Sequence, residues 1–333
     1  MGGWRRDDAG FSFAPVCVPT GRAGSMDGAP NGSAAARSAT VASERLLALV
    51  RGASAQGRPP ISRFNVGAVG VASSGRLYCG CNLEFCGSTM NATIHAEQFL
   101  CVVLAIHGER GMDELAVTAP PCGHCRQFMQ ELPAAGDVAV HIHRLSKVDK
   151  TDDAAALVRH DREEERLATS LHELLPHAFG PSDLVPDPTY LLQHSGECTR
   201  QALIDARDGI LAAYVSGGAG DAHGKLSEGL AKAARLARSN AYTPYSNCKA
   251  GVALVGADGR YAWGYNVECA AFNPTIAPLQ FALVHWVQGG GGDWMDIQRV
   301  TLCEEVGNTS YEAATRALLC AIAPEAHLEV VRP

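Results

Sequence analysis

Two short motifs in this chain contain the residue types of a catalytic metal site. A His-x-Glu motif contributes His95 and Glu97, and a Cys-x-x-Cys motif follows at Cys122 and Cys125. Two thiolates and one imidazole supply three ligands for a tetrahedral zinc ion and leave the fourth position for water, as in catalytic sites. Because two thiolates cancel the charge of Zn²⁺, this water is only weakly activated, and Glu97 is the expected general base. The sequence therefore predicts one catalytic zinc ion held by His95, Cys122 and Cys125.

The residues around the two cysteines favour thiolates. Cys122 and Cys125 lie three positions apart at the start of a predicted helix, which places both sulfurs on one side of its first turn, near unpaired N–H groups. Pro121 suits the first turn of a helix, where a missing N–H costs nothing. We expect the charge of Arg126 to draw electron density from the sulfurs without touching the metal. His124 is an alternative ligand, but we expect it to face solvent or to form a hydrogen bond.

Each motif alone has a more ordinary explanation. Cys-x-x-Cys also occurs in redox motifs and in structural zinc sites, and a single histidine on a buried helix is usually a core residue. Together and in this order, the motifs match the signature of zinc nucleobase deaminases. A non-catalytic zinc-stabilised paralogue remains an alternative, which Glu97 disfavours because a structural site has no use for a base.

The elements that must position these motifs alternate between strands and helices, which indicates an α/β sandwich with a mixed sheet flanked by helices. Residues 144–168 carry the densest charges and are predicted to be a surface connection. The predicted elements are a helix at 41–52, strands at Phe64–Ala72 and Leu77–Leu83, a helix at Thr93–His107, a strand at Glu114–Ala119, a helix at Gly123–Leu132 and a strand at Val138–His143.

The chain also contains an internal repeat, which predicts two copies of one fold. The matching segments are Pro60-Ile61-Ser62 with Pro244-Tyr245-Ser246 and Asn82-Leu83-Glu84 with Asn266-Val267-Glu268, both at an offset of 184 residues, and Asn91–Ile94 with Asn273–Ile276, at an offset of 182.

The second copy lacks the metal ligands. Ala277 and Leu279 stand at the positions of His95 and Glu97, and Thr301–Glu305 is the segment expected at the position of the cysteine motif. One zinc site per chain is therefore predicted. We expect a disordered segment at 1–40, a catalytic domain at 41–180 and a degenerate, non-catalytic domain at 181–333.

The composition of the chain limits the possible binding partners and the possible cellular compartments of the protein. The net charge of −7 and the lack of a Lys/Arg run argue against a nucleic-acid surface, and no stretch approaches the roughly 20 apolar residues of a membrane span. Most of the twelve cysteines lie in apolar segments, and no clean signal peptide is present, which indicates a reducing compartment, the cytoplasm. Residues 1–40 leave an organelle transit segment open, and Met26 is a second possible start.

From about residue 55 to the end, the sequence resembles the cytidine deaminase family, in particular its homodimeric two-domain branch from enteric bacteria and plants. That branch is similar in using one His and two Cys as zinc ligands and in carrying a zinc-free second copy. The resemblance rests on Phe64–Ala68, Asn82–Glu84, Thr93–Glu97, Pro121–Glu131, Ala178–Pro181 and Asn273–Thr275.

The resemblance implies roles for four side chains. Asn82 and Glu84 would hold the ribose 3′-hydroxyl, Phe64 would stack on the pyrimidine, and Phe179 would contact the base region near the dimer interface. Without the family, Phe64 could equally be a core residue and Asn82 a turn residue.

Two backbone groups also receive roles from the resemblance. The N–H of Ala96, at a helix start, would bind the pyrimidine 2-oxo group, and the carbonyl of Pro120 would receive the departing amino group. The chain departs from the family at Pro120, where Thr or Ala is common and the backbone is less stiff. It also departs at Arg63, where Asn is common, and at Cys86, where Pro is frequent.

The sequence thus predicts hydrolytic deamination of cytidine and deoxycytidine to uridine and deoxyuridine, with release of ammonia, in pyrimidine salvage by a homodimer. A deaminase of a cytosine nucleotide or polynucleotide is the alternative. Such enzymes need cationic groups for phosphate or exposed aromatics for flipped bases. The net charge of −7 and the acidic Glu84, at the place expected for a sugar hydroxyl, count against this alternative.

Overall fold

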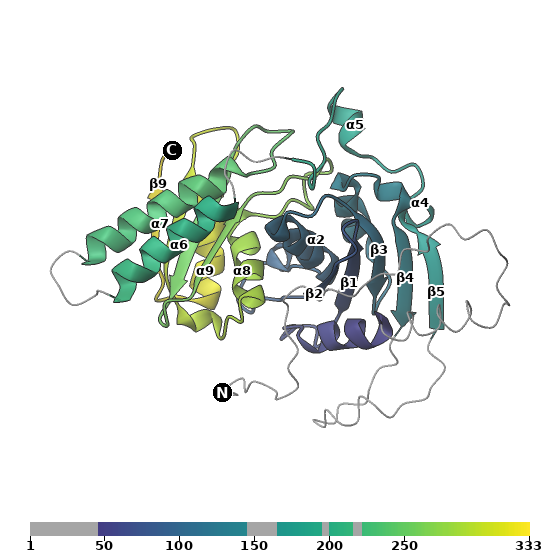
Figure 1. Cartoon of the computed structure of the whole chain (residues 1–333), viewed down its shortest axis with the longest axis horizontal. Coiled ribbons are helices and arrows are strands. Elements are labelled where there is room, and N and C mark those ends of the chain that lie inside the picture. The colour runs from purple at the N-terminus through teal and green to yellow at the C-terminus, as the bar shows by residue number, and fades with distance from the viewer. Residues whose placement is uncertain (1–45, 145–164, 195–199, 216–221) are drawn as a thin grey trace.

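The computed structural model of the chain describes residues 46–144, 165–194, 200–215 and 222–333, which form two sheets with helices packed on them (Figure 1). Residues 1–40, expected to be disordered, lie outside the described residues, as does Met26. None of the helices in the described part combines the length and the apolar composition that crossing a bilayer requires.

The first sheet has the strand order β2-β1-β3-β4-β5, in which β3 and β4 run parallel and all other neighbours run antiparallel. Its strands are β1 (Gly67–Ala72), β2 (Leu77–Cys81), β3 (Met112–Val117), β4 (Ala139–Arg144) and β5 (Glu165–Ser170). The helices of this half lie at residues 46–55, α2 (Ala96–His107), α3 (Gly123–Phe128), α4 (Leu171–Leu174) and α5 (Pro181–Leu184).

Helices cover both faces of β1, which explains why it reads as a nearly continuous apolar run. A Cβ at Gly67 would meet the backbone of Val50 in the helix at residues 46–55, and one at Gly70 would meet Leu100 of α2. Positions 67 and 70 point to opposite faces of the strand. The predicted mixed sheet flanked by helices is therefore confirmed.

The second sheet has the order β7-β6-β8-β9, with β8 and β9 parallel. This is the order of the first four strands of the other sheet. Its strands are β6 (Ala250–Gly256), β7 (Tyr261–Tyr265), β8 (Ile297–Glu304) and β9 (His327–Val331), and its helices are α6 (Arg200–Val215), α7 (Ala222–Ser239), α8 (Pro278–Gln288) and α9 (Glu312–Ile322).

The internal repeat is confirmed down to single bridges. Leu83 pairs with Ile94 in the first half, and Val267 pairs with Ile276 in the second half. One part of the predicted alignment is wrong. Thr301 of β8 pairs with Ala253 of β6, and Ala116 of β3 pairs with Val69 of β1 in the same way. Thr301–Glu304 therefore matches the strand before the cysteine motif and not the motif itself.

Several predicted elements differ from the structure at their ends. Residues 165–168, expected in a surface connection, belong to β5, which pairs with β4 through backbone bonds that its charged sequence does not reveal. The strand predicted from Phe64 begins at Gly67, and the helix predicted from Thr93 begins at Ala96. The helix predicted to reach Leu132 ends at Phe128 and continues as a 3₁₀ turn to Glu131.

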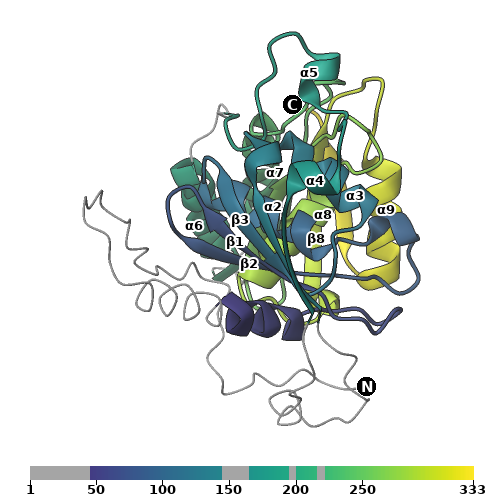
Figure 2. The same ribbon diagram turned by 90° about the vertical axis from the view of Figure 1, so that its right-hand side faces the viewer.

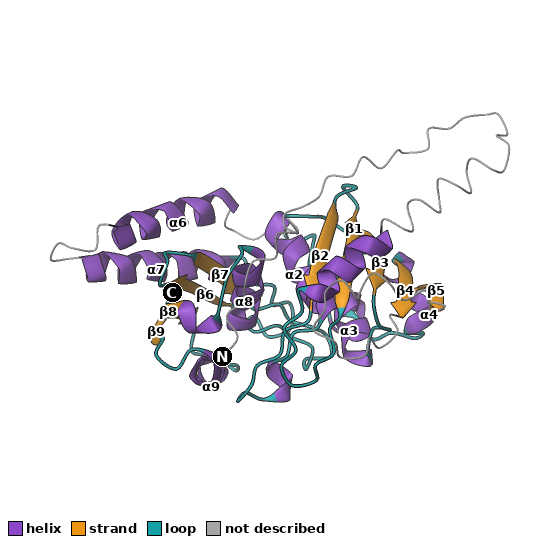
Figure 3. Ribbon diagram, turned by 90° about the horizontal axis from the view of Figure 1, so that it is seen from below, coloured by secondary structure: helices purple, strands orange, loops and turns teal. Residues whose placement is uncertain are grey.

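The two halves meet through α2 and α8, which pack against each other between the sheets (Figures 1 and 3). The view of Figure 2 looks onto the first half, behind which the second half lies. Both metal-site motifs come from the first half, at the starts of α2 and α3.

Candidate metal centre

Two helix starts bring the predicted ligands together. His95 is the N-cap residue of α2, and Cys122 is the N-cap residue of α3, with Cys125 inside its first turn. The Sγ atoms of Cys122 and Cys125 are 3.7 Å apart, and the Nδ1 atom of His95 lies 3.4 Å from the first sulfur and 3.2 Å from the second. Across the described ranges, these three residues are the group of His, Cys and acidic side chains close enough to hold a metal ion.

The spacing of these atoms fits zinc. Zinc–sulfur bonds of about 2.3 Å and zinc–nitrogen bonds of about 2.0 Å at tetrahedral angles separate two sulfurs by roughly 3.8 Å and a sulfur from a nitrogen by roughly 3.5 Å. The observed distances lie within about 0.3 Å of these values. Three donors on one side also leave one tetrahedral position open, as a catalytic site requires.

The protonation states suit metal binding and proton transfer. Hydrogen bonding from the Cys125 thiol lowers the pKa of Cys122 to about 3, whereas the pKa of Cys125 is raised by the same interaction and by burial. Binding of a divalent cation displaces the remaining thiol proton. Burial also raises the pKa of Glu97, whose Oε2 lies 3.4 Å from Cys125 Sγ. A carboxyl group with a raised pKa is suited to hold a proton between two transfers.

His124 is not a ligand in this geometry. It is exposed, and its Nε2 lies 3.1 Å from Nε2 of Gln98. Partial burial lowers the pKa of His124, so the neutral ring can accept a hydrogen bond from the Gln98 amide. The expected solvent-facing, hydrogen-bonding role of His124 is what the structure shows, and Gln98 is a site residue that the sequence motifs do not reveal.

Arg126 contacts backbone carbonyl groups. Its Nε donates to the oxygen of Pro121 at 2.7 Å, and its Nη1 donates to the oxygen of Leu174 at 2.8 Å. These bonds hold the backbone just before Cys122 and tie α3 to α4. An electrostatic effect of Arg126 on the sulfurs stays a prediction.

Asn82 and Glu84 are hydrogen-bonded within their own half. Asn82 accepts from the N–H of Val66 through Oδ1 and donates to the carbonyl of Phe64 through Nδ2, both at 2.9 Å. Glu84 accepts from the N–H groups of Ile61 and Ser62 through Oε2, at 2.9 Å and 2.8 Å. The loop that carries Phe64 is therefore held in place by the two side chains to which a sugar-binding role is assigned.

The two phenylalanines with expected base contacts are exposed. Phe64 is 48% exposed and Phe179 is 45% exposed. The backbone oxygen of Phe179 accepts a hydrogen bond of 2.6 Å from Nε2 of Gln127, one residue beyond Arg126, so this segment is attached to α3. Neither ring belongs to the core, which removes the core explanation for Phe64.

The two backbone groups with expected base contacts lie beside the ligands. Ala96 is the first residue of α2 and is buried, so its N–H is among those that lack an acceptor inside the helix. Pro120 is exposed and is followed by the buried Pro121. Their contacts with a base remain predictions.

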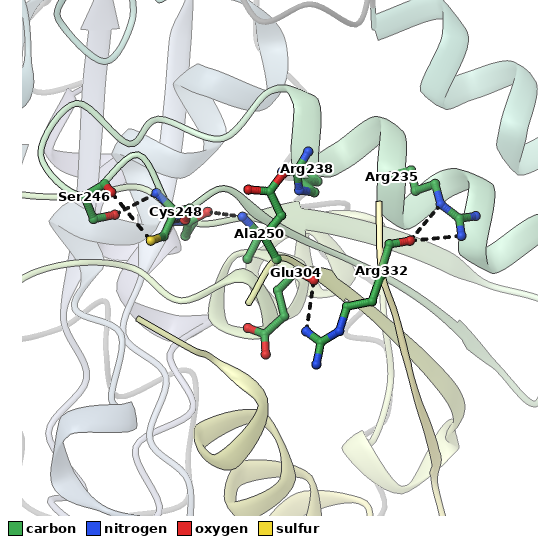
Figure 4. Close-up of polar contacts among 9 residues, drawn as sticks. Arg235, Arg238, Ser246, Cys248, Ala250, Glu304 and Arg332 are labelled. Atoms are coloured by element: carbon green, nitrogen blue, oxygen red, sulfur yellow. Dashed lines mark hydrogen bonds and ion pairs between the residues drawn. The ribbon is translucent and has the colours of Figure 1, made fainter. Parts of the chain in front are cut away.

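In the second half, side chains of the corresponding region are hydrogen-bonded to one another. The Glu304 carboxylate accepts from Ser310 Oγ and from the N–H of Tyr311, both at 2.7 Å, and Tyr311 Oη lies 3.1 Å from Nδ2 of Asn266. Figure 4 shows the surrounding network, in which Arg332 donates to the Glu304 carbonyl at 3.1 Å. With Ala277 at the position of His95, this half keeps the frame of the site without its ligands.

Comparisons with known proteins agree with this site. The cytidine and deoxycytidylate deaminase zinc-binding region matches the chain twice, at residues 41–142 and 171–316. Cytidine deaminase 1 of Arabidopsis thaliana is 37% identical over 290 residues, which cover 86% of this chain and 89% of that protein.

Solved structures of single-domain length match part of the chain. The cytidine deaminase of Mycobacterium tuberculosis matches at 27% identity and a TM-score of 0.30, over 40% of this chain and 93% of its own. That of Burkholderia pseudomallei matches at 26% identity and a TM-score of 0.31, over 41% of this chain and 98% of its own. The His95, Cys122 and Cys125 cluster and the matched zinc-binding regions together identify zinc as the cofactor. The chain belongs to the cytidine deaminase family.

Proposed function

We propose that this protein catalyses the zinc-dependent hydrolytic deamination of cytidine and deoxycytidine to uridine and deoxyuridine, with release of ammonia. The observation that carries the proposal is the position of Glu97. This residue is 4% exposed, and its carboxyl group lies beside the triangle of His95, Cys122 and Cys125. A structural zinc site has no use for a buried base at that place, whereas a hydrolytic site depends on one.

We assign both proton transfers of the reaction to Glu97. Bound zinc supplies a Lewis acid that lowers the pKa of a water molecule. Glu97 takes a proton from the attacking water and delivers it to N3 of the cytosine ring while the water oxygen adds to C4. Glu97 then carries the second proton to the amino group, which leaves as ammonia.

We assign the substrate contacts to groups around this centre. Phe64 and Phe179 contact the base, Asn82 and Glu84 contact the ribose 3′-hydroxyl, and the Ala96 N–H binds the 2-oxo group. The Pro120 carbonyl receives the departing amino group. Exposure of both phenylalanines and the hydrogen bond from Asn82 to the Phe64 carbonyl support this assignment.

We also propose a homodimer with a catalytic domain at 41–180 and a non-catalytic domain at 181–333, acting in pyrimidine salvage in the cytoplasm. The ten described cysteines are all free, as expected in a reducing compartment. Exposed apolar side chains of both halves, such as Phe179 and Phe272, support a covered surface in the assembly.

The role of Glu97 is tested with the Glu97→Gln variant, which keeps the shape of the side chain and removes the base. We expect zinc content to stay at one ion per chain and the turnover of cytidine to fall by about 10²–10⁴-fold. The loss is measured as ammonia release or as the change in ultraviolet absorbance, with zinc analysis of the same samples. Glu109→Gln is a matched control, because Glu109 is also buried and lies in the same half, where it accepts from Tyr78. Near-normal turnover by Glu97→Gln would overturn the assigned role.

Comparing cytidine, deoxycytidine and CMP as substrates tests the nucleoside assignment. A strong preference for CMP would contradict it in favour of a nucleotide deaminase. Full zinc content without ammonia release from any cytosine nucleoside would instead indicate a non-catalytic paralogue.

A further inference from the structure

A single buried amide group joins three separate segments at the metal centre. Oε1 of Gln98 accepts a hydrogen bond of 3.2 Å from the backbone N–H of His95. Nε2 of Gln98 lies 3.1 Å from Nε2 of His124 and donates at 3.1 Å to the backbone oxygen of Pro274. The side chain therefore links the start of α2, the turn between the two cysteines and a loop of the second half.

These contacts satisfy the amide group fully. Both N–H bonds of Nε2 and the oxygen of Gln98 have partners, and the residue is 2% exposed. Removing this buried amide takes one hydrogen-bond partner from each of three polar groups, and such a loss is costly wherever water cannot replace the partner. Two of these groups, the His95 N–H and the His124 ring, belong to the segments that carry the zinc ligands.

The second half contains an internal control for this arrangement. Gln280 occupies the equivalent position in α8, where Oε1 accepts from the N–H of Ala277 at 2.8 Å and Nε2 donates to the oxygen of Ala92 at 3.0 Å. Ala92 is the counterpart of Pro274 at the offset of 182 residues. The two glutamines thus cross the boundary between the halves in opposite directions, with nearly the same bonds.

The third contact distinguishes the two positions. Gln98 also contacts His124, which lies between two metal ligands, whereas Gln280 bonds to the backbone of Ala277, Asn91 and Ala92 and has no contact with the cysteine turn among the described residues. The common bonds therefore belong to the fold, and the bond to the cysteine turn is specific to the half that binds zinc.

We propose that Gln98 is a positioning residue for the zinc site. Its amide group fixes the His95 segment relative to the Cys122–Cys125 turn and attaches both to the Pro274 loop. The zinc-free half thereby stabilises the ligand geometry of the catalytic half through one side chain. The proposal rests on the zinc site and not on the identity of the substrate.

The test compares Gln98→Met with Gln280→Met, since Met keeps the length of Gln and removes its hydrogen bonds. Zinc affinity is measured by competition with a chromophoric chelator, and ligand geometry is measured from the visible absorption bands of the Co²⁺-substituted proteins. We expect Gln98→Met to weaken zinc binding by about 10–100-fold and to shift the Co²⁺ bands. Gln280→Met should change both less, because it loses the equivalent fold contacts but no contact with the cysteine turn. Equal zinc affinity in the two variants would overturn the proposal.

A second variant keeps the test decisive if Gln98→Met does not fold. His124→Phe changes an exposed ring and removes only the acceptor for Gln98, so we expect weaker zinc binding without loss of the fold. Where both variants fold, the double variant should lose less affinity than the product of the two single fold-changes, because both break the same bond. Zinc affinity of His124→Phe equal to that of the unmodified protein, or a fully multiplicative double variant, would contradict the linkage.

These measurements are independent of catalysis. If the unmodified protein released no ammonia from cytidine but Gln98→Met still weakened zinc binding selectively, the proposed function would fail and the role of Gln98 would stand. If the protein were active and Gln98→Met bound zinc normally, the proposed function would stand and the role of Gln98 would fail.

Discussion

At the scale of single residues, the repeat separates contacts that build the fold from contacts that serve chemistry. Glu268 accepts from the N–H groups of Tyr245 and Ser246, as Glu84 accepts from those of Ile61 and Ser62. These bonds persist in a half without zinc ligands, so they stabilise the loop whether or not a substrate binds. The sugar-binding role proposed for Glu84 is therefore additional to its role in stabilising this loop.

Glu131 links the two halves through its side chain. Its carboxylate is fully buried and accepts hydrogen bonds from Tyr242 Oη at 2.9 Å, from Tyr245 Oη at 2.7 Å and from the N–H of Ala270 at 2.8 Å. Burial nevertheless raises the pKa of Glu131 above its ordinary value of 4.5. The carboxyl group therefore retains a proton in the folded state at pH values where the unfolded state has lost it.

This shift predicts a pH dependence of stability. The protonated Glu131 contributes stability that is fully present below pH 4.5 and is lost as the pH rises through the raised pKa. We expect Glu131→Gln, which stays neutral, to gain stability relative to the unmodified protein as the pH increases from 4.5. The measurement is the free energy of unfolding in urea at a series of pH values. Parallel pH profiles for the two proteins would contradict the prediction.

At the scale of elements, two glycines allow the helices to lie close to the sheets. A Cβ at Gly80 in β2 would come within 2.4 Å of the Ala96 carbonyl oxygen in α2. A Cβ at Gly264 in β7 would come within 2.5 Å of the Pro278 carbonyl oxygen in α8. Both obstacles are backbone atoms, which cannot move aside without shifting the helix. In the first half, that helix start carries the zinc ligand.

Alanine at these two positions should therefore have different consequences. Gly80→Ala and Gly264→Ala should each lower the free energy of unfolding by about 1–3 kcal/mol because the helix must move away from the strand. Only Gly80→Ala should also weaken zinc binding, since it displaces the first turn of α2. Denaturant unfolding and chelator competition on both variants check this. Equal zinc binding by the two variants would contradict this prediction.

At the scale of the whole molecule, α2 and α8 form the centre of an internally repeated structure (Figure 1). The reciprocal bonds of Gln98 and Gln280 and the buried Glu131 make the halves one unit. Phe272, a large apolar side chain outside the proposed base contacts, nevertheless remains exposed on the surface of the second half. A further copy of the chain is the partner that we propose for this surface.

The homodimer predicts a particular mass in solution. Light scattering at micromolar concentration should give twice the chain mass of 35.1 kDa. Replacing Phe272, which is 65% exposed, with Ser should shift the mass toward a single chain without changing zinc content. A mass of one chain for the unmodified protein would contradict the homodimer.

The sequence alone determined the chemistry of the centre and the class of the fold. Ligand types and short spacings are local properties of the chain, so the two motifs suffice to predict His95, Cys122 and Cys125 as one set of ligands, and the structure brings these three side chains together. Strands covered on both faces also leave an apolar pattern, which is why the sequence predicts β1 and β2. The edge strand β5 is not predicted because its sequence, ERLATS, is polar and its pairing with β4 depends on distant backbone groups.

Only the tertiary structure decided how the second half supports the first. The alignment of Thr301–Glu304 failed because strand register is set by pairing with β6 and not by local sequence. Gln98 and Pro274 are 176 residues apart, and no local pattern brings them together. Spacing along the chain identifies which atoms can bind a metal, whereas the packing of α2 against α8 decides which other atoms hold those ligands in place.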